Sequence, residues 1–250
     1  MAPTSTSQTL TAVKALLLDM DGTLVNSDAV VERCWRRWAD ENGLDGDSVI
    51  KIVHGRQGHA TMAVLLPDRP VAENLVDNAR MLEWETSDVA GVVPVQGAPE
   101  FMAALADLPH ALVTSADRGL SKARMDAARL PMPRARITAE NVSASKPDPE
   151  GFLKGAAELG FAPADCVAFE DSEVGIAAAR SAGMRVIGVG PRAAAHEPTA
   201  HVRDLTQVRV EALPTGDITL HIAPCAGRGE APERHGGTAR APAAVHGGTG

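Results

Sequence analysis

Apolar and polar residues follow two different patterns along this chain, and the change comes near residue 92. In the first part, the run ALLL at 15–18 has the length and composition of a short buried strand. The residues that follow place their apolar side chains three and four positions apart, which is typical of amphipathic helices. This pattern predicts no strand between residues 27 and 91, and it predicts helices at 28–42, 47–53, 60–66 and 70–85.

From residue 92 onward, short apolar runs alternate with segments of helical periodicity. The runs predict strands at 110–115, 135–140, 166–171 and 184–190. The segments between them predict helices at 98–108, 120–130, 148–160 and 172–183. Such alternation is typical of a parallel sheet with helices packed on its faces. Two further apolar segments are compatible with edge strands or with a hairpin across the sequence PTG, namely 208–213 and 217–222.

These patterns predict an α/β protein, with a Rossmann-like parallel-sheet core and a small α-helical domain inserted into it. The core combines residues 12–26 with residues 92–222, and the helical insert spans residues 27–91. Residues 1–11 are polar and are expected to form a flexible tail. Residues 223–250 are rich in Ala, Gly, Pro, Arg and His, a composition that cannot bury a core, so they are expected to be disordered.

The composition narrows the classes of function. Hydrophobic residues make up 44% of the 250 residues, but aromatic residues make up only 3% and tyrosine is absent, so the core is expected to be aliphatic. A net charge of −8 argues against binding to nucleic acid or to an anionic membrane surface. It does not exclude a small anionic ligand, because a local basic pocket can override the overall field.

The cysteines and the N-terminal segment indicate in which cellular compartment the protein is expected. Cys34, Cys166 and Cys225 lie far apart without CxxC spacing, which favours reduced thiols over a disulfide framework. The segment MAPTSTSQTL lacks the apolar part of a signal peptide. No apolar run approaches the roughly 20 residues that a membrane span needs. The sequence therefore predicts a cytoplasmic protein.

Polar side chains with catalytic potential follow the predicted strands at their carboxyl ends. Open parallel sheets bind ligands at this edge, so these side chains are expected to converge there. They are Asp19 and Asp21 after the first strand, Thr114 and Ser115 after the next, Glu170 and Asp171 after a later one, and Lys146 from a loop before a helix. Oxygen ligands of this kind suit Mg²⁺, which would also offset the repulsion between neighbouring carboxylates.

Each of these elements has a simpler interpretation when it is taken alone. A DxD sequence after an apolar run is commonly a turn or a helix cap, and Thr–Ser at a strand end is common in turns. Lys146 would ordinarily be an exposed lysine, and Glu170–Asp171–Ser172 could cap the following helix. The order of four such elements along one sheet edge favours a shared site.

Four segments carry a family resemblance. DMDGTLV, ALVTSAD, SKPDPEGF and FEDSEVGIAAARSAG resemble, in order, the signature motifs of haloacid dehalogenase (HAD) superfamily phosphatases. The resemblance extends over residues 12–222 and includes a helical cap inserted after the first motif. The chain looks most similar to bacterial sugar and polyol phosphatases and to the glycerol-phosphate and deoxyglucose-phosphate phosphatases. It resembles β-phosphoglucomutase more distantly.

The resemblance implies a two-step phosphoryl transfer. Asp19 would be the nucleophile that attacks phosphorus and gives an aspartyl-phosphate. Asp21 would protonate the leaving alcohol and then deprotonate the attacking water. The dehalogenase branch usually lacks an acid at the position of Asp21, so its presence favours phosphoryl transfer over dehalogenation.

The resemblance also implies a Mg²⁺ site and a phosphate site at the same edge. The metal ligands would be Asp19, the backbone carbonyl of Asp21, Asp171 and, as a ligand or a neighbour of the ligands, Glu170. The groups that bind the phosphoryl oxygens would be Thr114, Ser115 and Lys146. Relatives often carry a glycine where this chain has Ser145, so the backbone before the lysine is more restricted here.

The helical insert is expected to set specificity through the loop IVHGRQGHA. Because this loop resembles the substrate-facing loop of related phosphatases, His54, Arg56 and Gln57 are predicted to bind the substrate, with Arg56 donating to hydroxyls or to a second anionic group. The nearby His59 is interpreted as part of a polar surface turn. The tryptophans are interpreted as packing residues rather than as a sugar platform: Trp35, Trp38 and Trp84.

The leading hypothesis is a Mg²⁺-dependent phosphatase that hydrolyses the monoester of a small polyhydroxylated metabolite. Sugar, polyol, glycerol and cyclitol phosphates are the candidates. The Ala, Arg, Pro and Gly content suggests a GC-rich genome, where pathways of specialised metabolism often include such a step. Two alternatives stay open: a β-phosphoglucomutase-like phosphomutase, which uses the same motifs, and a catalytically inactive sugar-phosphate binding protein. The expected partner is a small phosphorylated metabolite, and the expected state is a monomer or a weak homo-oligomer.

Overall fold

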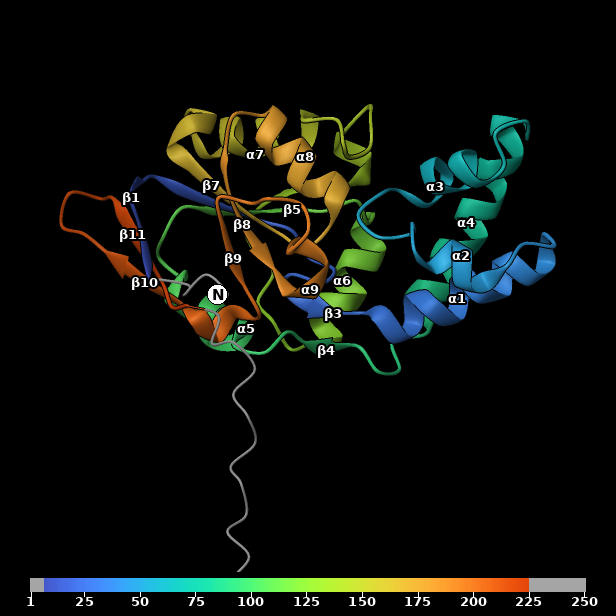
Figure 1. Ribbon diagram of the computed structural model, residues 1–250, viewed down its shortest axis with the longest axis horizontal. Helices are drawn as coiled ribbons and strands as arrows, with labels where there is room; N and C mark the ends of the chain where they lie inside the picture. Colours follow the sequence, from blue (N-terminus) through green and yellow to red (C-terminus); the bar gives the residue numbers. More distant parts are fainter. Residues whose placement is uncertain (1–6, 225–250) are drawn as a thin grey trace, which may run out of the picture.

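The computed structural model describes residues 7–224, and its centre is a six-stranded parallel sheet. Figure 1 shows this sheet with helices on its faces and the helical insert at one side. The predicted α/β class is therefore confirmed. The strands, in spatial order, are β6 (Ala135–Ile137), β5 (His110–Val113), β2 (Ala15–Leu18), β7 (Cys166–Glu170), β8 (Arg185–Val189) and β9 (Ala200–Val202).

The sheet separates two apolar clusters, because successive strand residues point to opposite faces. In β2, Leu16 and Leu18 face the cluster covered by α5 (Ala98–Ala104) and α6 (Arg118–Ala127). Leu17 faces the cluster covered by α7 (Glu150–Leu159) and α8 (Glu173–Ser181). All three leucines have no exposed surface, and each contributes roughly 1.5–3 kcal/mol by burial. This packing fixes the strand that carries the first motif.

The helical insert contains four helices and, among its described residues, no strand, as predicted. The chain enters the insert through β3 (Val25–Asn26) and leaves it through β4 (Val93–Pro94), and these two strands pair antiparallel. The helices are α1 (Asp28–Glu41), α2 (Gly46–Ile50), α3 (Gly58–Leu65) and α4 (Val71–Ser87). The prediction of a helix through residue 53 is wrong, because residues 51 and 52 form a turn before the loop that starts at Val53.

A second, three-stranded sheet lies at the end of the core opposite the insert (Figure 1). Its strands are β1 (Gln8–Val13), β11 (Ile218–Ile222) and β10 (Val208–Ala212). The predicted hairpin across PTG is thus present, and β1 pairs antiparallel with its second strand. The prediction of a flexible tail is wrong for residues 8–11, since pairing with a distant strand orders them and buries Leu10.

The remaining short elements connect these parts. They are α9 (Gly190–Ala193) and three 3₁₀ helices at Ala139–Asn141, Pro163–Asp165 and Leu205–Gln207. Within residues 7–224, no helix is long and apolar enough to cross a bilayer. Cys34 and Cys166 are free and buried, and burial raises the pKa of each thiol to about 11. The predicted disordered region begins at residue 223, and its residues 225–250 lie outside the described part.

Candidate active site

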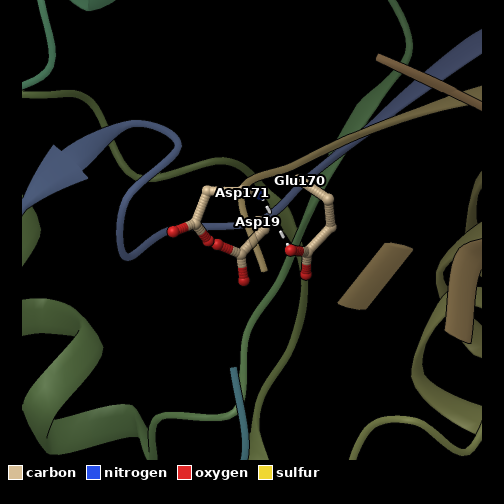
Figure 2. Close-up of side chains that lie close together, drawn as sticks. All are labelled: Asp19, Glu170 and Asp171. Carbon is tan, nitrogen blue, oxygen red and sulfur yellow. Dashed lines mark hydrogen bonds between the residues drawn. The ribbon is translucent and has the colours of Figure 1, made fainter. Parts of the chain in front are cut away.

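The carboxyl ends of three neighbouring strands bring the predicted acidic residues together. Because β5, β2 and β7 are adjacent and parallel, Thr114, Asp19 and Glu170–Asp171 emerge at one edge of the sheet. One carboxylate oxygen from each of Asp19, Glu170 and Asp171 lies within 4.8 Å of the others. Figure 2 shows these three side chains with their carboxylates gathered in one place.

Lys146 lies at the centre of this cluster, and its side chain is only 6% exposed. Its Nζ donates to Asp19 Oδ1 at 2.7 Å, to Glu170 Oε1 at 2.5 Å and to the carbonyl oxygen of Val113 at 3.2 Å. These contacts use all three donors of the ammonium group. Burial works against the lysine charge, but Asp19 and Glu170 raise the pKa of Lys146, so it is a fixed cation.

Glu170 is fully buried and serves as a structural anchor within the cluster. Its Oε1 accepts from Lys146, while its Oε2 accepts from the backbone N–H groups of Asp171 and Ser172 and from Ser172 Oγ. A Cβ on Gly175 would lie 1.9 Å from Glu170 Oε1, so only glycine fits that position of α8. Because both oxygens of Glu170 are already hydrogen-bonded, Asp19 and Asp171 are the better placed metal ligands.

Asp171 contacts an arginine that the sequence interpretation did not single out. Arg192 of α9 donates from Nε and Nη2 to Asp171 Oδ2, at 2.8 and 2.7 Å, and from Nη1 to Asp28 at 3.0 Å. Gly22 lies against the same oxygen, where a Cβ would approach Asp171 Oδ2 to 2.1 Å. Gly22 also has a φ of +89°, so its lack of a side chain allows both the turn and the close approach.

Asp21 is held by two groups that the motif alone did not indicate. Ser27 occupies the N-cap position of α1, but its hydroxyl donates to Asp21 Oδ1 at 2.7 Å instead of capping the helix. Arg124 of α6 donates to Asp21 Oδ2 at 2.8 Å. Both oxygens of the proposed acid–base residue are therefore fixed.

A cavity of about 80 Å³ lies between this edge of the core and the helical insert. From the core it is lined by Asp19, Asp21, Thr114, Ser115 and Arg124. From the insert it is lined by Trp35, His54, Arg56, Asn78 and Glu85, among others. Gln57, the third predicted substrate-binding residue of the loop, is absent from this lining, and so is His59.

The loop at 54–57 contacts the core directly. Ser115 Oγ donates to the carbonyl oxygen of Gly55 at 2.9 Å, and the backbone N–H of Gln57 donates to Ser145 Oγ at 2.9 Å. Ser145 of the core thus contacts the insert. Burial lowers the pKa of His54, and Arg192 lowers it further, so a neutral imidazole is favoured at the cavity wall.

The tryptophans of the insert mostly pack within it. Trp38 is fully buried and donates from Nε1 to Asp77 Oδ2 at 2.8 Å. Trp35 packs edge-on against Trp38, with ring centroids 5.5 Å apart, and it also forms part of the cavity wall. The guanidinium of Arg37 lies 3.8 Å from the centroid of the Trp84 ring.

Comparison with known proteins assigns this arrangement to a family. The sequence profile of the family described as haloacid dehalogenase-like hydrolase matches residues 13–183, more than half of the chain. This chain belongs to that family. The resemblance noted from the four motifs is confirmed, and so is the prediction that the chain is an enzyme of the HAD phosphatase type.

Known relatives of this HAD hydrolase include two phosphatases. Hexitol phosphatase A of Escherichia coli (strain K12) is 34% identical over 212 residues, which cover 83% of this chain and 98% of the relative. Glycerol-1-phosphate phosphohydrolase 1 of Saccharomyces cerevisiae is 32% identical over 200 residues, or 75% and 78% of the two chains. The structure of β-phosphoglucomutase from Clostridium difficile has a TM-score of 0.70 at 18% identity, covering 79% of this chain and 93% of the other, so it shares the fold.

The acidic cluster of this HAD hydrolase fits a divalent metal ion. Burial raises the pKa of Asp19, with Glu170 adding to the effect and Lys146 opposing it. Burial also raises the pKa of Asp171 to about 7, again with Glu170 adding to the effect. Carboxylates that are disfavoured by burial and by one another gain the most from a bound cation. Their oxygen donors match the preference of Mg²⁺.

We expect the stability of the metal-free protein to fall as the pH rises from about 4 to about 7. Over this interval Asp171 keeps its proton in the folded state, whereas its ordinary pKa of about 3.9 releases the proton on unfolding. The folded state then binds more protons, so raising the pH favours unfolding. Millimolar Mg²⁺ is expected to reverse this loss near neutral pH by roughly 1–3 kcal/mol, measured by thermal unfolding with EDTA or MgCl₂.

Asp171→Asn is expected to reduce the pH slope, of which Asp19 also contributes a part, and to remove the stabilisation by Mg²⁺. The matched control is Asp126→Asn, which alters an exposed acid on α6 that pairs with Lys122. Equal stabilisation of wild type and Asp171→Asn by Mg²⁺ would show that the ion binds elsewhere.

Proposed function

We propose that this HAD hydrolase is a Mg²⁺-dependent phosphatase that acts on the phosphomonoester of a small polyhydroxylated metabolite. The observation that carries the proposal is the placement of Asp19. Its Oδ1 is held by Lys146, its carboxylate lies beside that of Asp171, and it lines the cavity together with Asp21. A carboxylate so placed is a nucleophile with a fixed cation and an acid–base group at hand.

In the proposed reaction, Asp19 attacks the phosphorus of the ester and the bond from phosphorus to the alcohol oxygen breaks. Asp21 gives its proton to the departing alcohol. In the second step Asp21 takes a proton from water, the water oxygen attacks the aspartyl-phosphate, and inorganic phosphate leaves Asp19 free. Thr114 and Ser115 bind the phosphoryl oxygens, and the charge of Lys146 beside Asp19 offsets the negative charge of the phosphoryl group.

The metal ion would be held by Asp19 and Asp171 together with the backbone carbonyl of Asp21. Glu170 would fix the cluster through its hydrogen bonds with Lys146 and the backbone of Asp171. When bound, Mg²⁺ supplies positive charge that reduces repulsion between the carboxylates and the phosphoryl oxygens. The carboxylate cluster and its raised pKa values support this assignment.

The substrate class follows from the cavity and from the relatives. The insert contributes polar groups to the wall, including His54, Arg56 and Asn78, which can hydrogen-bond to hydroxyl groups. The two relatives named above are phosphatases of a hexitol phosphate and of glycerol 1-phosphate, as their names state. We therefore expect an alcohol portion rich in hydroxyls, with acyclic polyol phosphates as the first candidates.

The test is a phosphate-release screen over sugar, polyol, glycerol and cyclitol phosphates, with Mg²⁺ and with EDTA. We expect kcat/KM for the best polyol phosphate to exceed that for a simple alkyl phosphate by at least about tenfold, because hydroxyl contacts each contribute about 1 kcal/mol or more. Incubation with a hexose 1-phosphate and a bisphosphate primer is the counter-test. Isomerised hexose phosphate in place of inorganic phosphate would identify a mutase, and ligand binding without phosphate release would identify a binding protein.

A further inference from the structure

A buried arginine, Arg124, lies at the boundary of core and insert, and the roles proposed above do not use it. Arg124 projects from α6 of the core, and its side chain is only 4% exposed. Its Nη1 donates to Oδ2 of Asp21 at 2.8 Å, and its Nη2 donates to Oε2 of Glu85 at 3.1 Å. Since Glu85 lies on α4, one guanidinium contacts both domains.

The contact with Asp21 fixes the plane of that carboxylate. Ser27 Oγ donates to one oxygen while Arg124 donates to the other. A carboxylate with one donor can still rotate about its terminal bond, which has a broad torsional preference, whereas donors at both oxygens define one orientation. Arginine remains protonated at any ordinary pH, so Arg124 can orient Asp21 but cannot exchange protons with it.

The contact with Glu85 ties this orientation to the position of the insert. Glu85 is 7% exposed, and burial raises the pKa of its carboxyl, while the charge of Arg124 opposes this rise. A buried carboxylate that loses its only cationic partner is strongly destabilised. The ion pair with Arg124 therefore allows Glu85 to stay ionised when the insert docks on the core.

The remaining nitrogen of the guanidinium, Nε, allows a competing explanation of the role of Arg124. Nε of Arg124 is buried and has no hydrogen-bond acceptor among the described residues, and the side chain lines the cavity. Arg124 could therefore contact the alcohol portion of a substrate directly. The two explanations differ in what they require of Asp21, and the experiment below separates them.

We propose that Arg124 is a positioning residue for Asp21, and that Glu85 makes this positioning depend on the docked insert. When the insert docks, Glu85 fixes Nη2, and the rigid fork then presents Nη1 to Asp21. Proton delivery to the leaving group is thus aligned when the insert closes over the cavity. The proposal rests on the proposed acid–base role of Asp21.

The first measurement compares two esters of nearly equal shape, phenyl phosphate and 4-nitrophenyl phosphate. Phenol has a pKa of about 10 and needs a proton to leave, whereas 4-nitrophenolate is a better leaving group and needs little help. The ratio kcat/KM reports only the steps up to leaving-group release. We expect Arg124→Gln to lower kcat/KM about 30-fold for phenyl phosphate and by no more than about threefold for 4-nitrophenyl phosphate.

The control on the same helix is Arg118→Gln, which alters an exposed arginine outside the cavity and is expected to change neither value. If Arg124→Gln caused misfolding or loss of substrate binding, kcat/KM would fall by the same factor for both esters. Equal losses for the two esters would therefore overturn the positioning role.

A double-mutant cycle with Asp21→Asn tests whether Arg124 acts through Asp21. If it does, adding Arg124→Gln to Asp21→Asn costs less than about threefold on phenyl phosphate, because the group to be oriented is already lost. If Arg124 instead binds the substrate directly, the two losses multiply. Multiplicative losses would overturn the proposal.

The role of Glu85 is tested in the same assay. Glu85→Ala frees Nη2 of Arg124 and is expected to lower kcat/KM for phenyl phosphate more than for 4-nitrophenyl phosphate, in the pattern of Arg124→Gln. Glu85→Gln keeps an oxygen acceptor for Nη2 and is expected to restore most of the loss. If Glu85→Ala leaves the ratio of kcat/KM between the two esters unchanged, the positioning of Asp21 does not depend on the contact with the insert.

Failure of the proposed function gives a different result from failure of this inference. If the wild-type protein releases no phosphate from any ester in Mg²⁺, both proposals fall. If the wild type is active but the cycle is multiplicative, the phosphatase assignment stands and only the role of Arg124 is overturned.

Discussion

Asp19→Asn is expected to lower phosphate release by roughly 10⁴-fold or more, the scale at which losing a covalent nucleophile reduces turnover. An amide oxygen can still accept a hydrogen bond from Lys146 in place of Oδ1. It cannot form the aspartyl-phosphate, because the amide lacks the negative charge and the basicity of a carboxylate. The loss should be equal for esters with good and poor leaving groups, since neither can react without the nucleophile.

The fold of Asp19→Asn is expected to be intact, with a melting temperature within about 5 °C of wild type. Burial raises the pKa of Asp19, so the charged form is disfavoured where it stands, and a neutral amide of the same size removes this penalty. Circular dichroism and thermal unfolding check the fold, and steady-state phosphate release checks the activity.

The control for Asp19→Asn is Asp40→Asn, which makes the same substitution at an exposed position of α1. We expect wild-type activity from it. Normal Mg²⁺-dependent turnover by Asp19→Asn would mean that another group attacks phosphorus, and the mechanism proposed for this cluster would have to be abandoned.

The residues on which these predictions depend could be located from the sequence because strand ends are local signals. Apolar runs mark β2, β5 and β7, and parallel pairing then places Asp19, Thr114 and Asp171 at one edge without further information. The same logic extended to Lys146, whose position in the loop before α7 is close to the sheet. The motifs and their order were therefore sufficient to predict that these residues lie close together.

The partners of these residues could not be predicted in this way. Arg124 lies 103 residues from Asp21, and on an amphipathic helix it looks like any solvated cation until α4 packs over it. Arg192 lies on α9, which follows β8. It contacts Asp171 because its guanidinium lies beside Gly22 of the first motif. Such contacts depend on how separate elements pack, which periodicity does not encode.

The error at the N-terminus has the same origin. The segment at 8–11 contains three polar residues and one leucine, which is too short an apolar pattern to predict a strand from the sequence. Its order comes from antiparallel pairing with β11, more than 200 residues away in sequence. Its strand structure therefore depends on tertiary pairing, as does that of the two-residue strands β3 and β4.

Lys146→Met is the second substitution for which we expect a large effect, and it should reduce both stability and activity. Lys146 donates to two buried carboxylates, so its loss leaves Asp19 and Glu170 without that cation. Breaking a buried pair in this way costs about 3–5 kcal/mol, or roughly 6–20 °C in melting temperature for a chain of this size. Activity is expected to fall by about 10²–10³-fold, because a fixed charge aimed at the phosphoryl group is lost.

The stability loss should depend on pH. The pKa of Lys146 is raised above its ordinary value, so its contribution is fully present below about pH 10 and does not itself vary near neutrality. Removing it raises the pKa of Asp19 further, and the folded state then retains a proton that the unfolded state releases. The variant is therefore expected to be closest to wild type near pH 5 and to lose stability as the pH rises to about 8.

Glu170→Gln in the Lys146→Met background separates the two effects. Neutralising Glu170 removes one of the uncompensated charges, while its amide oxygen can still accept from the backbone N–H groups of Asp171 and Ser172, so part of the stability should return. Activity should not return, because the ammonium group of Lys146 is still missing beside Asp19. The matched control is Lys154→Met, an exposed lysine on α7 that pairs with Glu150 and is expected to change stability by less than about 1 kcal/mol. If the double variant is no more stable than Lys146→Met, the lysine contributes through packing rather than through charge, and the electrostatic account of this cluster is wrong.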